Sequence, residues 1–371
     1  MERIRQFDWT LQAAVTLLLS LSVAVIFATT FGDSGSGGTR DAAQQALFAL
    51  LGTGLVVIIG VSDYRVFRRT AGVLYLIALA TLLLVEVIGV SALGATRWID
   101  LGFFQFQPSE FAKIVMVIVL AKVFADHQKT LNTPRTFFKS LAYTLVPVLL
   151  VAGQPDLGTA MVFMGTWLGM AVAAGLPKRM FAWTGAVTAG LLPVFWFWLL
   201  RDYQKRRVMT LIDPTADPLG AGYNVQQAQI AVGSGGFFGR TLGSGTQSQL
   251  NFLPVQHTDF IFAVIAEELG FVGALLLLGL LATVAYRSLA IARGAHDFFG
   301  YLLAMGIMLI VIIQTLVNVG MNTGIMPVTG IPLPFVSYGG TSILMLLLAV
   351  GILQSVASSR SRRTAPAPFG R

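Results

Sequence analysis

The chain has 371 residues, of which 55% are hydrophobic and only 11% are charged. A composition this apolar cannot be buried in one soluble core, so it excludes an ordinary soluble globular protein and predicts a membrane protein with several spans. Cysteine is absent and only 3 histidines occur. Disulfides, thiolate chemistry and iron–sulfur clusters are therefore excluded, and a histidine-based metal site is not expected.

Apolar runs close to the ~20 residues that cross a bilayer recur along the whole chain. We expect about ten membrane-spanning helices, at 9–31, 41–61, 71–90, 108–125, 138–153, 156–175, 180–200, 259–286, 298–321 and 338–357. The predicted fold is an all-α polytopic membrane protein with a single transmembrane domain over 1–357. Residues 201–258 form one long extracytoplasmic loop in this prediction, and the basic remainder, 358–371, is expected to be a disordered cytoplasmic tail.

The net charge of +8 is explained by membrane topology. Most Lys and Arg residues fall in segments that share one side of the membrane when the N-terminus is cytoplasmic, as the positive-inside rule requires. The first span follows the short basic segment "MERIRQ", and we interpret it as an uncleaved helix rather than a cleaved signal sequence. An even number of spans places both termini in the cytoplasm, and nucleic acid is not an expected partner.

Polar residues inside the predicted spans gather toward the outer side of the membrane. Gln314, Asn318 and Asn322 repeat every four residues and so form one stripe. Charged groups at membrane depth normally face a protein interior or a water-filled cavity, so we expect a site that opens to the outside. The ionisable members of this group are Glu86, Arg97, Glu110, Lys113, Asp156 and Asp259.

Each of these residues also has a purely structural interpretation. Asp156 and Asp259 can be first-turn carboxylates that the helix dipole favours. Glu110 and Lys113 can be an i,i+3 ion pair on one helix. Their shared side of the membrane favours a functional site.

The predicted external loop contains a basic cluster, Lys205, Arg206 and Arg207, on the side where positive charge is not needed to orient helices. Contact with lipid headgroups and binding of an anionic pyrophosphate both explain this cluster. The glycine-rich stretch 233–239 does not have the spacing of a phosphate-binding loop, and Arg240 stands where that motif needs lysine. We interpret the glycines as positions of flexible backbone and close packing.

Three prolines, Pro327, Pro332 and Pro334, prevent a continuous helix through 322–340. Broken backbone at the rim of a membrane is tolerated where it is buried in protein or lines a cavity. We expect this segment, which includes Ser337, to fold over or into the outer side of the bundle.

Five stretches of the sequence resemble one known family. They are "GATRWIDLGFFQFQPSEFAKI" (94–114), "GQPDLGTA" (153–160), "DPLGAGYNVQQAQIAVGSGGFFG" (217–239), "QLNFLPVQHTDFIFAVIAEELGFVG" (249–273) and "GIMPVTGIPLPFVSYGG" (324–340). On these residues the chain resembles the SEDS family (shape, elongation, division and sporulation), and "WIDLG" favours its elongation-type members. The resemblance implies a peptidoglycan glycosyltransferase that polymerises lipid II on the outer face of the bacterial cytoplasmic membrane. It also implies a class B penicillin-binding protein and other elongation-complex membrane proteins as partners.

In that reaction a sugar hydroxyl attacks the anomeric carbon of a second lipid-linked disaccharide and displaces undecaprenyl pyrophosphate, which gives a β-1,4 glycan strand with inversion. A carboxylate must take the hydroxyl proton, and cations must hold the leaving group. The aspartate usually assigned as essential in the family corresponds to Asp259, which we predict to be the general base. The predicted substrate-binding residues are Lys113, Glu110, Asp156, Arg97, Arg206, Arg207, Asn318, Asn322 and Ser337.

A divalent cation, Mg²⁺ or Mn²⁺, that bridges Asp156 or Asp259 to the pyrophosphate is a further expectation, because Mg²⁺ often binds through one or two carboxylates plus phosphate oxygens. Glu267 and Glu268 come about 12 Å deeper along the predicted helix by its 1.5 Å rise, so we assign them to structure. Two other functions stay open, a transporter that flips lipid II and a non-catalytic scaffold for the penicillin-binding protein.

Overall fold

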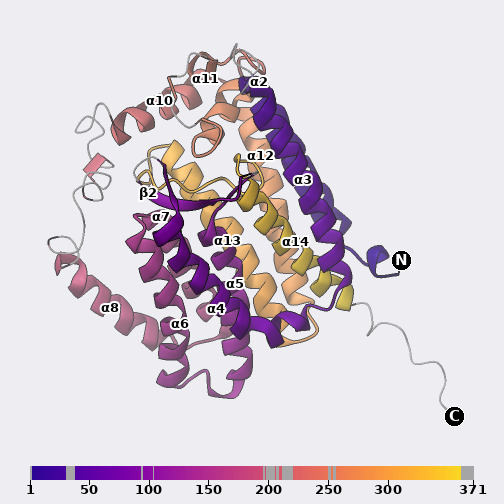
Figure 1. Cartoon of the computed structure of the whole chain (residues 1–371), viewed down its shortest axis with the longest axis vertical. Coiled ribbons are helices and arrows are strands. Elements are labelled where there is room, and N and C mark those ends of the chain that lie inside the picture. The colour runs from indigo at the N-terminus through magenta and orange to yellow at the C-terminus, as the bar shows by residue number, and fades with distance from the viewer. Residues whose placement is uncertain are drawn as a thin grey trace.

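The computed structural model describes residues 2–30, 38–92, 95–102, 104–194, 197, 205, 209–210, 220–249, 252–253 and 256–360. Most of them are helical, as predicted, and the long helices stand side by side in one bundle (Figure 1). The helices are α1 (Glu2–Arg5), α2 (Trp9–Thr30), α3 (Gly38–Val61), α4 (Arg65–Ile88), α5 (Pro108–Asp126), the 3-10 turn η1 (Gln128–Thr130), α6 (Pro134–Gly153), α7 (Leu157–Ala174), α8 (Lys178–Val194), α10 (Ala221–Ser234), α11 (Thr246–Gln249), α12 (Ile261–Arg293), α13 (Phe298–Asn322) and α14 (Gly340–Arg360).

Among the described residues, 8 helices are long and apolar enough to cross a membrane: α2, α3, α4, α6, α7, α12, α13 and α14. This confirms the predicted multi-pass architecture. The total of about ten spans stays a prediction, because it also needs α5, which carries Glu110 and Lys113, and α8, of which 17 residues are described. Helix α14 continues to Arg360, beyond the domain boundary predicted at residue 357.

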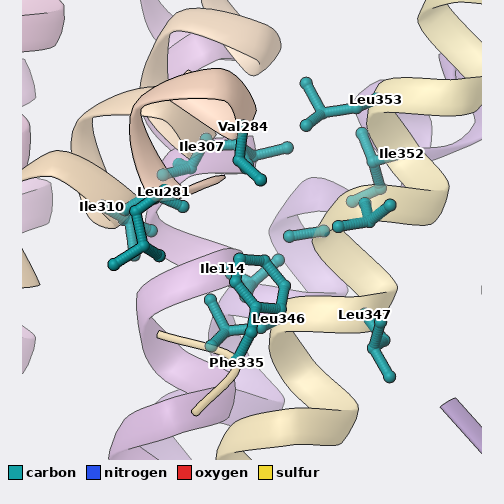
Figure 2. Close-up of a cluster of buried hydrophobic side chains, with 14 of the residues drawn as sticks. Ile114, Leu281, Val284, Ile307, Ile310, Phe335, Leu346, Leu347, Ile352 and Leu353 are labelled. Atoms are coloured by element: carbon teal, nitrogen blue, oxygen red, sulfur yellow. The ribbon is translucent and has the colours of Figure 1, made fainter. Parts of the chain in front are cut away.

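Among the eight apolar helices, α13 and α14 are the best enclosed, with 61% and 72% of their apolar windows buried, compared with 22% for α4. Figure 2 shows how side chains of α5, α12, α13 and α14 meet between the helices, for example Ile114, Leu281 and Ile310. Lipid is as apolar as these side chains, so helices associate in a bilayer mainly through close packing. Glycines allow the closest approaches: a Cβ added at Gly306 would lie 2.5 Å from Cγ1 of Val117 and 2.8 Å from Sδ of Met170.

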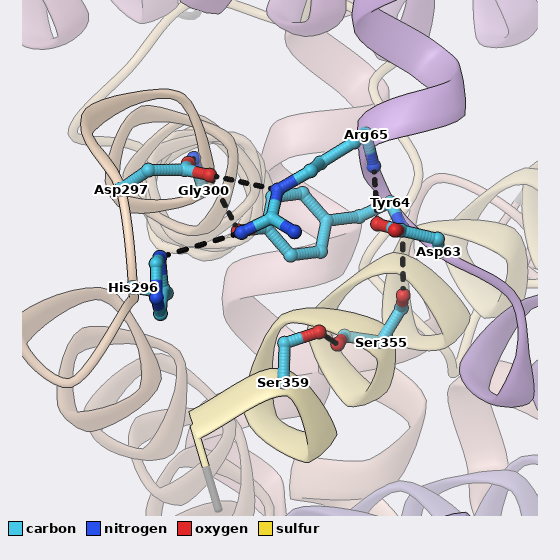
Figure 3. A network of polar contacts seen from close by, with 8 residues as sticks. All are labelled: Asp63, Tyr64, Arg65, His296, Asp297, Gly300, Ser355 and Ser359. Carbon is cyan, nitrogen blue, oxygen red and sulfur yellow. Dashed lines mark hydrogen bonds and ion pairs between the residues drawn. The ribbon is translucent and has the colours of Figure 1, made fainter. Parts of the chain in front are cut away.

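A network of polar contacts ties helix ends together at one end of the bundle, which we call the Asp297 end (Figure 3). Asp297 caps α13 by accepting a hydrogen bond from the N–H of Gly300 at 2.8 Å. Its Oδ2 also accepts bonds from the Tyr64 hydroxyl at 2.9 Å and from Arg65 Nε at 3.2 Å. The Tyr64 N–H donates to Ser355 Oγ of α14 at 3.0 Å. The start of α4, the start of α13 and the end of α14 are therefore fixed to one another.

These contacts set the charge states at the Asp297 end. Burial alone would raise the pKa of the Asp297 carboxyl, but the hydrogen bonds from Gly300, Tyr64 and Arg65 outweigh burial and hold that pKa below its ordinary value. Burial and the neighbouring Asp297 raise the pKa of Tyr64, so its hydroxyl stays a donor. Asp297 is therefore an ionised acceptor at neutral pH.

We predict that Asp297→Asn lowers the free energy of unfolding by about 1–2 kcal/mol at neutral pH, because it removes a charged acceptor shared by two donors. A carboxyl whose pKa is lower in the folded state stabilises fully above its unfolded pKa, and it loses this effect as the pH falls through the folded pKa. The melting temperatures of the two proteins should therefore converge on acidification. Asp126→Asn is the control, because it breaks only an exposed ion pair with Arg68. A difference in melting temperature that stays constant at acid pH would contradict the role given to the Asp297 charge.

A small antiparallel sheet, which the sequence analysis did not predict, precedes α5. Its strands are β1 (Val90–Ala92), β2 (Ala95–Asp100) and β3 (Gln105–Phe106), and β2 lies in the middle. Ile99 pairs with Phe106, and the turn between them is closed by a bond from Gly102 N–H to Asp100 Oδ1 at 2.8 Å. The sheet holds Arg97 in a defined place on β2.

Helix α12 is not straight, because Gly270 has φ 67° and ψ −166° and divides it into two parts. The glycine-rich segment after α10 fits against this break and supplies the missing backbone partners: Phe271 N–H donates to Gly236 O at 2.9 Å, and Arg240 N–H donates to Glu267 O at 3.1 Å. A Cβ at Gly270 would lie 2.3 Å from Gly239 N. The glycines therefore serve close backbone packing, as predicted.

The two parts of α12 run in opposite directions along the bundle. Helix α13 starts at the Asp297 end. Its Asn318 side chain donates to Asp259 O. One turn further from that end, Asn322 Oδ1 accepts from Ala263 N–H. The part 261–269 therefore runs away from the Asp297 end. The part after Gly270 returns to that end, where Arg287 pairs with Asp8. We call the opposite end of the bundle the Asp259 end.

This course corrects the predicted depth of the two glutamates. The prediction assumed one continuous helix from Asp259, but the helix is divided at Gly270, and the buried part 261–269 runs away from the Asp297 end. Glu267 Oε1 accepts a bond from Gln247 N–H at 2.9 Å, and α11, which contains Gln247, also bonds to Ala28 near the end of α2. Glu267 therefore lies further toward the Asp259 end than Asp259 itself, and its structural role stays a prediction that the bond from Gln247 supports.

Candidate active site

Asp259 lies in the turn formed by residues 256–260, directly before α12. Three consecutive carbonyls of this turn accept bonds from other elements: His257 O from Tyr338 N–H at 2.8 Å, Thr258 O from Ser337 Oγ at 2.5 Å, and Asp259 O from the side-chain amides of Asn318 and Asn322 at 2.9 and 3.1 Å. Backbone carbonyls inside a membrane protein need such partners, because no water satisfies them there. The position of Asp259 is thus set by α13 and by the non-helical segment 323–339.

The Asp259 side chain is half-buried and reaches toward Gly330 in that segment. A Cβ added at Gly330 would lie 3.4 Å from Asp259 Oδ2 and 4.0 Å from Arg97 Nη1. The carboxylate and the guanidinium therefore approach the same point beside Gly330. Gly330 also has φ 71°, a conformation that glycine adopts without strain.

Arg97 connects this point to the start of α7. Its Nη1 lies 3.8 Å from Asp156 Oδ1, and its Nη2 donates to Pro155 O. The exposed fractions of the two side chains are 13% for Arg97 and 3% for Asp156. Asp156 caps α7, since its carboxylate accepts from Thr159 N–H at 3.1 Å and from Thr159 Oγ1 at 2.9 Å. The aspartate fixes the arginine, and the arginine presents positive charge beside Asp259.

Lys113 and Glu110 form the predicted i,i+3 pair on α5, with 2.7 Å between Lys113 Nζ and Glu110 Oε1. Both side chains are almost completely buried, with an exposed fraction of 3% each. Removing two charges from water is costly unless the pair is close and its remaining hydrogen-bonding groups are satisfied. A buried pair of this kind is weak evidence for stability and stronger evidence for a function.

Comparisons with known proteins show which family the chain belongs to. A family model of the FtsW/RodA/SpoVE cell cycle proteins matches residues 6–362. The chain belongs to the FtsW/RodA/SpoVE family.

Individual members of the FtsW/RodA/SpoVE family cover nearly the whole chain. It is 41% identical over 347 residues to the peptidoglycan glycosyltransferase MrdB of Escherichia coli, which covers 93% of each protein. Among solved structures, a chain of a peptidoglycan synthase complex that coordinates polymerisation and crosslinking matches with a TM-score of 0.80 and 32% identity, over 95% of this chain and 98% of that one. The rod shape determining protein RodA of Thermus thermophilus matches with a TM-score of 0.69 and 29% identity, over 95% and 97%.

The predicted site residues of this FtsW/RodA/SpoVE chain fall into four groups, one of which is the buried Lys113–Glu110 pair on α5. Arg97, Asp156 and Asp259 meet around Gly330. Asn318, Asn322 and Ser337 are buried and use their side chains on backbone groups of the Asp259 turn, so binding of substrate by them stays a prediction. Arg206 and Arg207 lie outside the described residues, while Glu86 is exposed on α4.

Two contributors to the site were missed in the sequence. Gly330 was overlooked because the prolines around it dominated the interpretation of 322–340, although a glycine between two prolines is itself a signal for unusual backbone. Thr159 follows Asp156 by three residues, which is the spacing of a helix cap, and this signal was available.

The residues present do not fit a metal ion held by the protein alone. Among the described residues, no group of three or more His, Asp or Glu side chains converges on a point. Both carboxylate oxygens of Asp156 already accept hydrogen bonds from Thr159. The divalent cation stays a proposal in which the substrate phosphates supply most of its ligands, and we derive no step through it.

Proposed function

We propose that this chain polymerises lipid II into β-1,4 glycan strands by inverting transfer. Asp259 takes the proton of the attacking sugar hydroxyl while the hydroxyl oxygen forms a bond to the anomeric carbon of the second lipid II. The bond from that carbon to the pyrophosphate oxygen breaks, and undecaprenyl pyrophosphate leaves. The relative in Escherichia coli is named a peptidoglycan glycosyltransferase, which supports this class of enzyme.

The observation that carries the proposal is the approach of Asp259 and Arg97 to one point at Gly330. Transfer from a pyrophosphate needs a proton acceptor on one side of the anomeric carbon and positive charge on the other. Asp259 supplies the first and Arg97 the second. Asp156 keeps the guanidinium in place, so its charge is directed before substrate arrives.

The flippase alternative needs a polar route from one side of the membrane to the other. At the level of Gly306, α5, α7 and α13 close on the apolar side chains of Val117 and Met170. The charged residues of the candidate site, Arg97, Glu110, Lys113, Asp156 and Asp259, lie between this contact and the Asp259 end. This arrangement favours an enzyme that works from one side.

We further infer that the Asp259 end faces outward and that both termini are cytoplasmic, because Arg65, Arg68 and Arg287 gather at the Asp297 end. A class B penicillin-binding protein is the proposed partner. The likeness to a chain of a peptidoglycan synthase complex supports a partner of this kind.

The decisive experiment gives lipid II to the purified chain together with a class B penicillin-binding protein whose transpeptidase serine has been replaced. A ladder of glycan products that depends on the chain supports the enzyme. Movement of lipid II between the leaflets of vesicles, without polymer, would support the flippase instead. Neither activity, with rod growth restored in cells, would support the scaffold.

We predict that Arg97→Gln slows polymerisation by roughly tenfold to a hundredfold, because the leaving pyrophosphate loses its preorganised positive charge. The melting temperature should also fall, because Asp156 is only 3% exposed and loses its ion-pair partner, so the rate is measured on folded protein. The comparison variant is Arg68→Gln, which removes an exposed arginine at the other end. Equal rates for the two variants would remove Arg97 from the mechanism.

A further inference from the structure

Three helices that contact one another, α5, α7 and α13, carry buried polar residues within one or two helical turns of the apolar contact at Gly306, on its Asp259 side. Helices α5 and α7 run toward the Asp297 end, and α13 runs the other way. Counted from Gly306 toward the Asp259 end, Gln314 is two turns along α13. In the same direction, Lys113 is one turn from Val117 on α5, and Thr166 is one turn from Met170 on α7.

Residues separated by three, four, seven or eight positions share one face of a helix. Lys113 and Glu110 therefore lie on the face of α5 that carries Val117, and Thr166 lies on the face of α7 that carries Met170. Two more contacts confirm the register of α7 against α13: a Cβ at Gly165 would lie 3.0 Å from Ile313 Cδ1, and one at Gly169 would lie 2.6 Å from Leu309 Cδ1. We call Glu110, Lys113, Thr166 and Gln314 the three-helix polar junction.

The junction contains buried polar atoms that have no hydrogen-bond partner among the described residues. These are both side-chain atoms of Gln314, whose exposed fraction is 1%, and the hydroxyl of Thr166, whose exposed fraction is 0%. The helical Thr144, in contrast, donates to the carbonyl four residues earlier.

The ion pair in the junction also needs further hydrogen-bond partners. An ammonium group carries three N–H donors, and among the described residues Lys113 Nζ makes one hydrogen bond, to Glu110. Each buried donor or acceptor that loses water without gaining a partner costs more than an ordinary hydrogen bond contributes. Buried waters in proteins typically make about three hydrogen bonds to such groups.

We propose that the three-helix polar junction binds ordered water molecules, which hydrogen-bond Gln314 and Thr166 and solvate the Lys113–Glu110 pair. The ligand is water, and Gln314 and Thr166 are positioning residues that act on the pair through it. The catalytic consequence rests on the proposed function: the solvated pair, which has no net charge, keeps the Lys113 ammonium group in a fixed place on the Asp259 side of the Gly306 contact. The water site itself stands on burial and register alone.

The first test is the sign of a stability change. Removing an orphaned polar group from a dry core stabilises a protein, whereas removing one that holds water breaks hydrogen bonds. We expect Gln314→Met and Thr166→Val each to lower the melting temperature by about 2 °C or more. An unchanged or raised melting temperature for Gln314→Met would overturn the proposal.

Matched controls calibrate this result. Gln45 is fully buried and donates hydrogen bonds to Ser22 Oγ and Ser337 O. Gln45→Met therefore shows how far the melting temperature falls when a glutamine loses protein partners. Thr144→Val does the same for a buried helical threonine. Thr166→Ser keeps the hydroxyl and should retain wild-type stability and activity, while Thr166→Val should polymerise about tenfold more slowly. A serine variant that behaves like the valine variant would show a purely steric effect and sink the idea.

The second test looks for the water directly. A high-resolution map of the full chain should show solvent density about 3 Å from the Gln314 amide, and the same density in the Asp259→Asn protein. A well-resolved map with apolar atoms packed against that amide would contradict the proposal. The stability and density readouts do not depend on polymerisation, so failure of the wild-type chain to polymerise would count against the proposed function and leave the water site intact.

Discussion

Asp259→Asn should leave the chain folded and reduce lipid II polymerisation by about 10²–10⁴-fold, the usual contribution of a general base. Asparagine has nearly the same shape but cannot accept the proton of the attacking hydroxyl. The backbone contacts that fix the turn come from Asn318, Asn322 and Ser337, and the substitution does not remove them. Gel analysis of labelled glycan products, with the melting temperature measured in parallel, separates loss of chemistry from loss of fold.

Two comparison variants sharpen this result. Asp100→Asn changes a carboxylate in the nearby β2–β3 turn and should polymerise at the wild-type rate. Asn322→Ala leaves the Asp259 carboxylate in place but removes a donor to its carbonyl, so it should be slower and less stable. Normal polymer from Asp259→Asn, next to a slow Asn322→Ala, would mean that the turn matters and that its carboxylate is not the base.

Gly270→Ala should lower the free energy of unfolding by about 2–4 kcal/mol and slow polymerisation by roughly a hundredfold. The added Cβ would lie 2.3 Å from Gly239 N and 2.7 Å from Phe237 O, both backbone atoms that cannot rotate away. The left-handed conformation of residue 270 adds strain of about 1–3 kcal/mol for any other residue. Because 261–269 begins just after Asp259, a shift at the break displaces the carboxylate, and about 1 Å of displacement can cost a hundredfold in rate.

The same helix offers a control for this prediction. A Cβ at Gly279 meets nothing within 4 Å, so Gly279→Ala should be neutral or stabilise the helix by about 0.5–1 kcal/mol. Both variants can be compared by thermal melts in detergent and by polymerisation rate. A Gly270→Ala protein as stable and active as Gly279→Ala would show that the break in α12 is not required.

The sequence predicted the membrane class and most helix bounds well, because apolar runs report directly on the need to cross hydrocarbon. It also placed Arg97, Asp156 and Asp259 on one side, where the structure brings them together. It could not predict the course of α12, since an isolated glycine inside an apolar run does not distinguish a continuous helix from a reversal. The partner of that reversal is the glycine-rich segment more than thirty residues earlier, and such a long-range backbone fit leaves no periodic pattern.

The small sheet was missed for a related reason. Its strands are short and one turn separates each pair, so alternation extends over too few residues to be recognised. The stripe of Gln314, Asn318 and Asn322 was found, but the three amides serve different purposes. Asn318 and Asn322 hold backbone, whereas Gln314 lies among buried groups one and two turns away from them. Periodicity identifies a face of a helix, and only the neighbouring elements decide what that face contacts.

The turn that carries Asp259 is gripped from two directions, by amides on α13 and by Ser337 and Tyr338 from the segment before α14. The Asp259 carboxylate must therefore move whenever one of these supports is displaced relative to the other. A protein that pressed on either support from outside would retune catalysis without approaching the sugar. Under the proposed function, the rate of polymerisation thus depends on the distance between α13 and the segment before α14.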